Sequence, residues 1–226
     1  MTEISVVPDP AGVVADLLVQ AAEAGEHIVL TGGSTPADAY RRAAGAGADW
    51  RTATVWFGDE RCVAPDDERS NYGMASATLL ERLPADARPR VFRMRGEAGP
   101  EAGAAAYERE LRAELGEQPR FDLLLLGLGD DGHMASLFPG KPGVKEIERK
   151  VVGVPEAGLA PFVPRISLTV PVINAARRVV FLVSGAGKAT AVARAFGSGS
   201  GPAVPAGLVV DPLVVLDAAA ASELER

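Results

Sequence analysis

Four consecutive leucines, Leu123 to Leu126, restrict the fold of this chain more than any other feature of its sequence. A strand that is apolar at every position must be covered on both faces, which is typical of a parallel sheet packed between helices. A strand with one face in water would instead alternate between apolar and polar residues. The leucine run, extended back to Phe121, therefore predicts a central strand of an α/β sheet.

The rest of the chain alternates short apolar runs with amphipathic stretches. This pattern predicts a doubly wound, mostly parallel Rossmann-like sheet with helices on both faces. We expect strands over 27–30, 53–57, 91–94, 121–126, 165–170, 178–183 and 213–216, and helices over 11–24, 37–44, 70–83, 101–115 and 187–196. A length of 226 residues suits one domain spanning 1–226. The stretch 139–164 predicts a small irregular excursion, and 197–205 a surface loop.

The charge balance limits the class of partner. With 23 Lys and Arg against 30 Asp and Glu, the chain carries a net charge of −7, so we expect no nucleic-acid partner. The single cysteine, Cys62, excludes an intrachain disulfide and fits a reducing compartment. The sequence shows no signal-peptide pattern, and its apolar runs are too short to span a membrane. A cytoplasmic protein without a membrane partner is the expectation.

Two segments between predicted strands and helices suggest an anion site. The first, TGGSTP at 31–36, brings backbone amides to a helix N-terminus, which favours an anion; the alternative is a simple turn capped by a side chain. Its candidate ligand residues are Thr31, Gly32, Gly33 and Ser34. The second, SGAGK at 184–188, puts Lys188 near a helix start, where its charge opposes the helix dipole and suggests an anionic partner. Arg165, at the start of a predicted strand, is a further candidate anion ligand.

The segment FGDERC at 57–62 follows a predicted aromatic strand. Adjacent acidic residues point to different sides, so Asp59 or Glu60 could face a pocket. Arg61 could pair with an anionic substrate in fork geometry. The alternative is an ordinary solvated charged loop. We expect Cys62 to be a small buried residue and not a nucleophile.

The segment GLGDDGH at 127–133 follows the leucine strand directly. It matches the dinucleotide-binding pattern GxGxxG in form, but Pro139 comes too soon for the long helix that such a site needs. A carboxylate beside an imidazole, by contrast, orients the ring and stabilises its charged form. His133 is therefore a candidate for acid–base chemistry, whereas His27, which begins a predicted strand, is expected to be structural. No Cys/His cluster has metal-ligand spacing and the dinucleotide pattern is rejected, so we expect neither metal nor cofactor. No GxSxG nucleophile motif occurs either.

In family order, several segments resemble those of the 6-phosphogluconolactonases. They are TGGSTP at 31–36, WFGDERCV at 56–63, SNYGMA at 70–75, LLGLGDDGHMASLFPG at 125–140, RISLTVPVINAARRVVFLVSGAGKA at 165–189 and PAGLV at 205–209. A wider group with the same fold includes the glucosamine-6-phosphate deaminases and isomerases. The deaminases carry a glutamate five residues after the motif histidine, where this chain has Phe138. They also read Asp-Glu-Tyr where this chain reads Asp-Glu-Arg at 59–61.

This resemblance implies a carboxylic ester hydrolase that converts 6-phospho-D-glucono-1,5-lactone to 6-phospho-D-gluconate in the oxidative pentose phosphate pathway. His133 would take a proton from water and return it to the ring oxygen, which is worth roughly 10²–10⁴ in rate. Asp131 would orient His133 or the water, and Asp59 would be a second polar contact near the reacting carbon. The division of roles among Asp59, Asp130 and Asp131 stays open.

The same resemblance implies that the phosphate lies on the amides of Gly32, Gly33 and Ser34. Lys188 and Arg165 would add charge-assisted hydrogen bonds, each worth roughly 1.5–3 kcal/mol. Whether Arg61 binds the phosphate or acts at the reacting carbon stays open. A small phosphosugar lactone is the expected partner, and a monomer or weak homo-oligomer the expected state.

Three rival functions remain for comparison. An amino-sugar phosphate deaminase or isomerase is disfavoured by Phe138, which cannot relay a proton. A sensor of sugar phosphates would need no water-activating pair, yet both Asp131 and His133 are present. A nicotinamide-dependent oxidoreductase is disfavoured by the short segment that follows the glycine motif.

Overall fold

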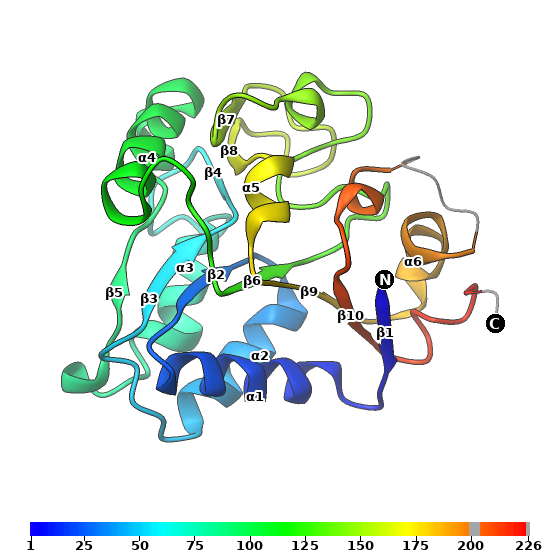
Figure 1. Cartoon of the computed structure of the whole chain (residues 1–226), viewed down its shortest axis with the longest axis horizontal. Helices are drawn as coiled ribbons and strands as arrows, with labels where there is room; N and C mark the ends of the chain where they lie inside the picture. The colour runs from blue at the N-terminus through cyan, green and yellow to red at the C-terminus, as the bar shows by residue number, and fades with distance from the viewer. Residues whose placement is uncertain (199–203, 225–226) are drawn as a thin grey trace.

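The computed structural model of the chain describes residues 1–198 and 204–224. Within these ranges a central sheet has the strand order β1-β10-β9-β6-β2-β3-β5, and every neighbouring pair is parallel. The strands are β1 (Glu3–Val6), β2 (His27–Leu30), β3 (Thr54–Phe57), β5 (Arg90–Val91), β6 (Leu123–Leu126), β9 (Arg178–Val183) and β10 (Leu213–Leu216). The four leucines of β6 are buried at the centre of this sheet (Figure 1). The predicted doubly wound parallel sheet is confirmed.

The sheet is wound in two directions from its centre. From β2 the chain moves outward through β3 to β5, then returns to β6 on the other side of β2 and moves outward through β9 to β10. The β2 and β6 strands are parallel neighbours, with Ile28 opposite Leu123, so their carboxyl ends lie at the same edge. The loops that leave such a switch point diverge and open a crevice, which is where doubly wound folds bind ligands.

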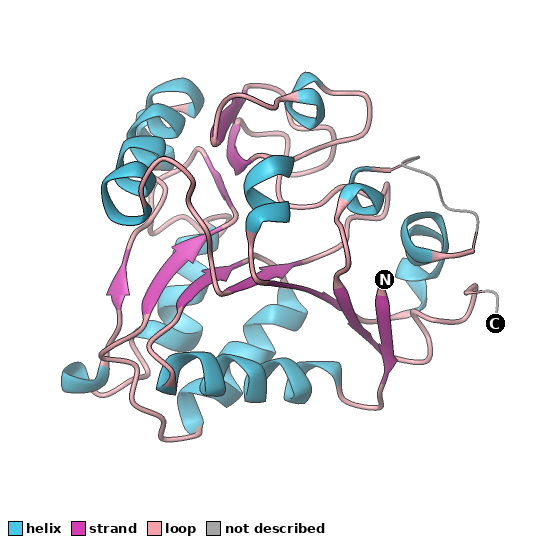
Figure 2. Ribbon diagram, in the orientation of Figure 1, coloured by secondary structure: helices cyan, strands magenta, loops and turns pink. Residues whose placement is uncertain are grey.

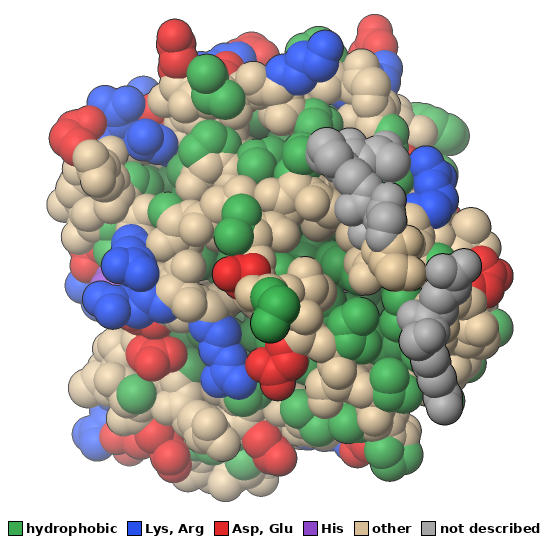
Figure 3. All heavy atoms as spheres, turned by 45° about the vertical axis from the view of Figure 1, so that its right-hand side comes forward, with side chains coloured by type: hydrophobic (Ala, Val, Ile, Leu, Met, Phe, Trp, Pro, Cys, Tyr) green, Lys and Arg blue, Asp and Glu red, His purple; other side chains and the backbone are tan. Residues whose placement is uncertain are grey.

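Helices cover both faces of the sheet. They are α1 (Pro10–Glu23), α2 (Ser34–Gly45), α3 (Asn71–Ala75), α4 (Pro100–Leu115), α5 (Val170–Ala175) and α6 (Ala189–Phe196). Figure 1 shows α1 and α2 below the sheet and α4 and α5 above it. Among the described residues, no helix is both long and apolar enough to cross a membrane. Acidic and basic side chains are intermixed on the face shown in Figure 3.

A second, smaller antiparallel sheet corrects one prediction. Its strands are β4 (Asp59–Arg61), β8 (Arg165–Leu168) and β7 (Val151–Val154), in the order β4-β8-β7 (Figure 2). The segment 165–170 was expected to continue the main alternation, but β8 pairs with β4 and ends at Leu168. All four β8 residues are buried, as in a strand of the central sheet, although the partners of β8 lie outside that sheet. Burial therefore does not distinguish the two positions. The strand β7 lies inside the stretch 139–164, which is therefore less irregular than expected.

Several element boundaries also differ from expectation. The strand predicted over 91–94 is the two-residue β5, and the helix predicted over 70–83 is α3 followed by a π-helical turn, Ser76–Leu80. The helix predicted over 187–196 begins at Ala189, after a 3-10 turn over Ala186–Lys188. Neither β1 nor α5 was expected. The predicted loop 197–205 includes 199–203, which lie outside the described ranges.

Candidate active site

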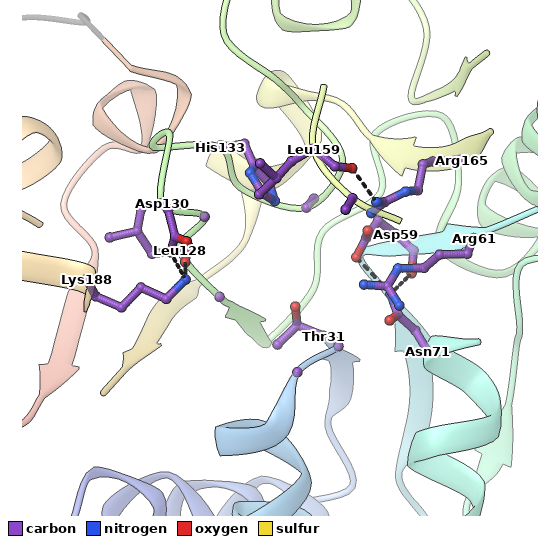
Figure 4. A pocket seen from close by; sticks show the side chains of 16 residues that line it. Thr31, Asp59, Arg61, Asn71, Leu128, Asp130, His133, Leu159, Arg165 and Lys188 are labelled. Atoms are coloured by element: carbon purple, nitrogen blue, oxygen red, sulfur yellow. Dashed lines mark hydrogen bonds and ion pairs between the residues drawn. The ribbon is translucent and has the colours of Figure 1, made fainter. Parts of the chain in front are cut away.

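A cavity of about 240 Å³ opens where the loops after β2 and β6 diverge (Figure 4). It is lined by Thr31, Gly32, Gly33, Asp59, Arg61, Asn71, Gly127, Leu128, Gly129, Asp130, His133, Ala135, Leu159, Ala160, Arg165 and Lys188. The structure thus brings together most of the candidate residues, which are up to 157 positions apart in the chain, from Thr31 to Lys188. Two candidates are not lining residues: Asp131 lies behind His133, and Ser34 is the first residue of α2.

The imidazole of His133 is fixed by Asp131. Its Nδ1 lies 2.6 Å from Oδ1 of Asp131, and the backbone N–H of His133 donates to the same oxygen at 3.0 Å. Partial burial raises the pKa of Asp131, but the two bonds from His133 together hold this pKa below its ordinary value. An ionised Asp131 can only accept, so Nδ1 carries the hydrogen and the neutral ring keeps its lone pair on Nε2.

Two neighbours restrict the position of this ring. A Cβ atom at Gly129 would overlap the His133 imidazole, so the close approach of the turn requires glycine there. The ring of Phe138, which is buried, packs against the imidazole with centroids 4.6 Å apart. The phenyl ring therefore occupies the space beside the histidine without offering a group that can exchange protons.

Two arginines lie on the opposite side of the cavity from Lys188 (Figure 4). Arg61 and Arg165 are directly paired in the register of β4 and β8. Each has an Nε atom that is buried without a hydrogen-bond partner among the described residues. Burial lowers the pKa of Arg165 from its ordinary value. Two adjacent cations with unused donors are the arrangement that an anion would complete.

One terminal nitrogen of each guanidinium group binds backbone carbonyls. Arg165 donates from Nη2 to Leu159 at 3.2 Å and to Pro161 at 3.0 Å, and its guanidinium carbon lies 5.5 Å from the centre of the Phe138 ring. Arg61 donates from Nη1 to the carbonyl of Arg69 at 2.6 Å. These bonds orient both side chains before any ligand is present.

The glycine loop after β2 is fixed by a buried tyrosine. The hydroxyl of Tyr40, on α2, accepts from the N–H of Thr31 at 2.9 Å and donates to its carbonyl at 2.8 Å. The helix α2 begins at Ser34 with Gly33 as its N-cap, and no side chain caps it. The alternative of a turn capped by Ser34 or Thr35 is therefore wrong. A helix start without a side-chain cap leaves amide donors that favour an anion.

Lys188 reaches the cavity from the other side. Its Nζ donates to the carbonyl of Leu128 at 2.7 Å and to Oδ1 of Asp130 at 2.6 Å. The side chain of Asp130 is 69% exposed. An ion pair so open to water contributes little to stability, so Lys188 can exchange this partner for a ligand at small cost.

Asp59 and Glu60 point in different directions, as predicted. Asp59 lines the cavity and is buried, whereas Glu60 turns away from it. The Glu60 carboxylate accepts from the N–H groups of Arg61, Asn71 and Tyr72 and from the hydroxyl of Ser70. Burial raises the pKa of Glu60. This carboxylate therefore fixes the start of α3 against β4.

Two side chains that the sequence analysis did not single out bind Asp59. Asn71 Nδ2 donates to its Oδ1 at 3.1 Å, and Ser136 Oγ donates to its Oδ2 at 2.6 Å. Both partners are distant in sequence from Asp59, at separations of 12 and 77 residues. No local sequence pattern predicts that these residues contact Asp59, although both lie in segments that carry the family resemblance.

His27 is structural, as predicted, whereas Cys62 is only partly buried and not the buried residue that was predicted. His27 Nδ1 accepts from Trp56 Nε1 at 3.1 Å, which is a structural contact within the central sheet. Burial, together with the charge of Glu60, raises the pKa of Cys62 to about 11, so this thiol stays protonated and a poor nucleophile near neutral pH. Among the described residues, no group of three or more His, Cys, Asp and Glu side chains is arranged to hold a metal ion.

Comparison with known proteins identifies relatives of this chain in sequence and in structure. The 6-phosphogluconolactonase of Streptomyces coelicolor is 44% identical over 225 residues, covering 92% of this chain and 85% of that protein. The structure of 6-phosphogluconolactonase from Trypanosoma cruzi has a TM-score of 0.87 at 29% identity, covering 100% of this chain and 98% of the other. The structure of a monomeric glucosamine-6-phosphate deaminase shares the fold, with a TM-score of 0.78 at 23% identity. The match covers 99% of this chain and 100% of the other.

The family model described as glucosamine-6-phosphate isomerases/6-phosphogluconolactonase matches residues 9–215. The matched range contains every residue that lines the cavity. The resemblance inferred from the sequence motifs is therefore confirmed. This chain belongs to the glucosamine-6-phosphate isomerase/6-phosphogluconolactonase family.

Proposed function

We propose that this chain hydrolyses 6-phospho-D-glucono-1,5-lactone to 6-phospho-D-gluconate, in the oxidative pentose phosphate pathway of the cytoplasm. The observation that carries the proposal is the 2.6 Å contact between His133 Nδ1 and Asp131 Oδ1 at a cavity that is also lined by three cationic side chains. Curated relatives that match most of the chain include the 6-phosphogluconolactonases of Streptomyces coelicolor and of Mycobacterium tuberculosis, the latter at 39% identity over 87% of this chain.

His133 is the general base in this mechanism. Its Nε2 lone pair takes a proton from a water molecule, whose oxygen attacks the lactone carbonyl. The tetrahedral intermediate then expels the ring oxygen, which receives the proton back from the imidazolium. Asp131 stabilises the imidazolium and does not itself exchange the proton. Because water is the nucleophile, the reaction needs no covalent enzyme intermediate.

The phosphate occupies the uncapped start of α2. Backbone amides at Gly33 and Ser34 offer neutral donors there, and the helix dipole favours negative charge. Lys188 and Arg165 line the same cavity on opposite sides and would supply positive charge to a phosphate bound there (Figure 4). Binding at this remote group holds the lactone carbonyl in line with the activated water, which lowers the barrier by orientation.

Phe138 favours lactone hydrolysis over deamination. Deamination of an amino-sugar phosphate requires proton transfers on the sugar beyond those that one histidine supplies. The side chain beside His133 is here an apolar ring, 1% exposed. It offers no second acid or base at this position, whereas ester hydrolysis needs only one.

The test offers the purified protein two substrates. The lactone is generated in situ, its spontaneous hydrolysis is subtracted, and 6-phosphogluconate is measured through a coupled dehydrogenase. Ammonia release from glucosamine 6-phosphate is measured in parallel. Lactone hydrolysis well above the spontaneous rate, without ammonia release, supports the proposal. Ammonia release without enhanced lactone hydrolysis would assign the site to deamination.

A further inference from the structure

The orientation of the Asn71 amide is determined by its neighbours. Nδ2 lies 2.9 Å from the carbonyl oxygen of Asp59 and 3.1 Å from Oδ1 of the same residue. Both of these atoms are acceptors, so only the NH₂ group of Asn71 can face them. The Oδ1 atom must therefore point the other way. Glu60 holds the backbone N–H of Asn71 at 2.7 Å, which fixes where the side chain begins.

This Oδ1 atom is an unused acceptor in the floor of the cavity. Asn71 is only 2% exposed, yet it lines the cavity. No described residue donates to its Oδ1. The protein does not enclose this atom completely, so a ligand in the cavity can reach it. It lies against Gly32, where an added Cβ atom would overlap it. Figure 4 shows the side chain beside Arg61, across the cavity from Lys188.

The chemistry of the substrate decides what such an acceptor can bind. A phosphate near neutral pH is mostly dianionic, with a second pKa of about 6, and its oxygens accept hydrogen bonds. The lactone carbonyl and the ring oxygen are acceptors as well. The ring hydroxyls are therefore the only donors that a fully ionised phosphosugar lactone carries. A buried acceptor without a partner favours a ligand that supplies the missing donor.

We propose that Asn71 Oδ1 accepts a hydrogen bond from a ring hydroxyl of the lactone, which makes Asn71 a specificity-determining residue. This inference rests on the proposed function and adds a hydroxyl contact to it. The Asn71 amide then has two roles: Nδ2 donates to Asp59 and holds it in place, and Oδ1 recognises a ring hydroxyl of the substrate. Aspartate in its place would set a carboxylate oxygen against the two acceptors of Asp59.

The test compares hydroxyl discrimination in wild type and Asn71→Ala. The kcat/KM value is measured for the parent lactone and for the three lactones lacking the hydroxyl at C2, C3 or C4. Wild type should prefer the parent over one deoxy lactone by about three- to tenfold, the value of one neutral hydrogen bond. In Asn71→Ala this preference should disappear, while the ratios for the other two deoxy lactones remain as in wild type.

Ser136→Ala is the matched control, because it removes the other hydrogen bond to Asp59 and leaves Asn71 in place. It should keep the wild-type ratios. If Asn71→Ala does not fold, Gly32→Ala displaces Oδ1 directly and should remove the same preference. An equal loss of kcat/KM for all four lactones would overturn the inference and leave Asn71 a support of Asp59. Wild-type protein that hydrolyses none of the lactones would overturn the proposed function itself.

Discussion

Asp131 binds His133 twice through one oxygen atom, at 2.6 Å to the ring Nδ1 and at 3.0 Å to the backbone N–H. The two residues are separated by Gly132 alone, so the turn itself positions the pair. A third bond, from the N–H of Gly129 to the carbonyl of His133 at 2.9 Å, closes the turn. The orientation of the imidazole is thus built into a short loop at the end of β6 and does not wait for a substrate.

Asp131→Asn should lower kcat about 10²–10⁴-fold with little change in KM. The amide is neutral, so it no longer stabilises the imidazolium, and its NH₂ group can donate to Nδ1 and select the wrong tautomer. Steady-state kinetics on the lactone measure both parameters. A rise in KM with an unchanged kcat would instead make Asp131 part of the binding site.

Tyr40→Phe should destabilise the protein by about 1–3 kcal/mol and raise KM for the lactone. The change leaves the N–H and the carbonyl of Thr31 without their partner and releases a loop that lines the cavity. Urea unfolding measures the free energy of unfolding, and initial rates give KM.

Tyr107→Phe is the matched control for this prediction. Its buried hydroxyl accepts from the N–H of Phe57 at 2.9 Å and donates to the carbonyl of Phe57 at 3.2 Å, and Tyr107 does not line the cavity. The two variants should lose similar stability, but only Tyr40→Phe should show a raised KM. Equal effects on KM would mean that the loop position does not depend on Tyr40.

Gly129→Ala should reduce kcat at least 100-fold, because the new methyl group overlaps the His133 ring and must displace it. Gly127→Ala is the comparison: apart from its chain neighbours, the described residues come within 4 Å of its added Cβ only at the carbonyl oxygen of Gly32, at 3.9 Å. This second variant should keep kcat within a few-fold of wild type. Equal activity of the two variants would show that the ring position is not limiting.

Lys188→Ala should weaken the binding of 6-phosphogluconate by about ten- to a hundredfold, the value of a charge-assisted hydrogen bond. Asp130→Ala removes the carboxylate that now competes for Nζ, so this variant should bind the product as tightly as wild type or more tightly. Isothermal titration calorimetry measures both affinities. Unchanged affinity in Lys188→Ala would remove this residue from the phosphate site.

The central sheet was predictable because its strands are apolar and its helices amphipathic. The leucines of β6 and the glycine loops that follow β2 and β6 place the cavity at a switch point by topology alone. The small sheet was not predictable in the same way. The strand β4 contains three charged residues, Asp59 to Arg61, and a charged run of this length reads as a solvated loop.

The fine structure of the cavity depends on contacts between distant segments. The His133–Asp131 pair could be inferred because its members are two positions apart. The bonds from Asn71 and Ser136 to Asp59 could not, because they join strand β4, helix α3 and the loop that carries Ser136, whose approach is set by the packing of these distant segments. The unused Nε atoms of Arg61 and Arg165 likewise follow from burial, which the sequence does not display.

Lactone hydrolysis by His133→Ala tests the central claim most directly. The rate of 6-phosphogluconate formation is measured against wild type after subtraction of the spontaneous reaction, and product affinity is measured separately. We predict a fall in kcat of about 10²–10⁴-fold with product affinity nearly unchanged. A variant that hydrolyses the lactone at the wild-type rate would contradict the assignment of His133 as the general base.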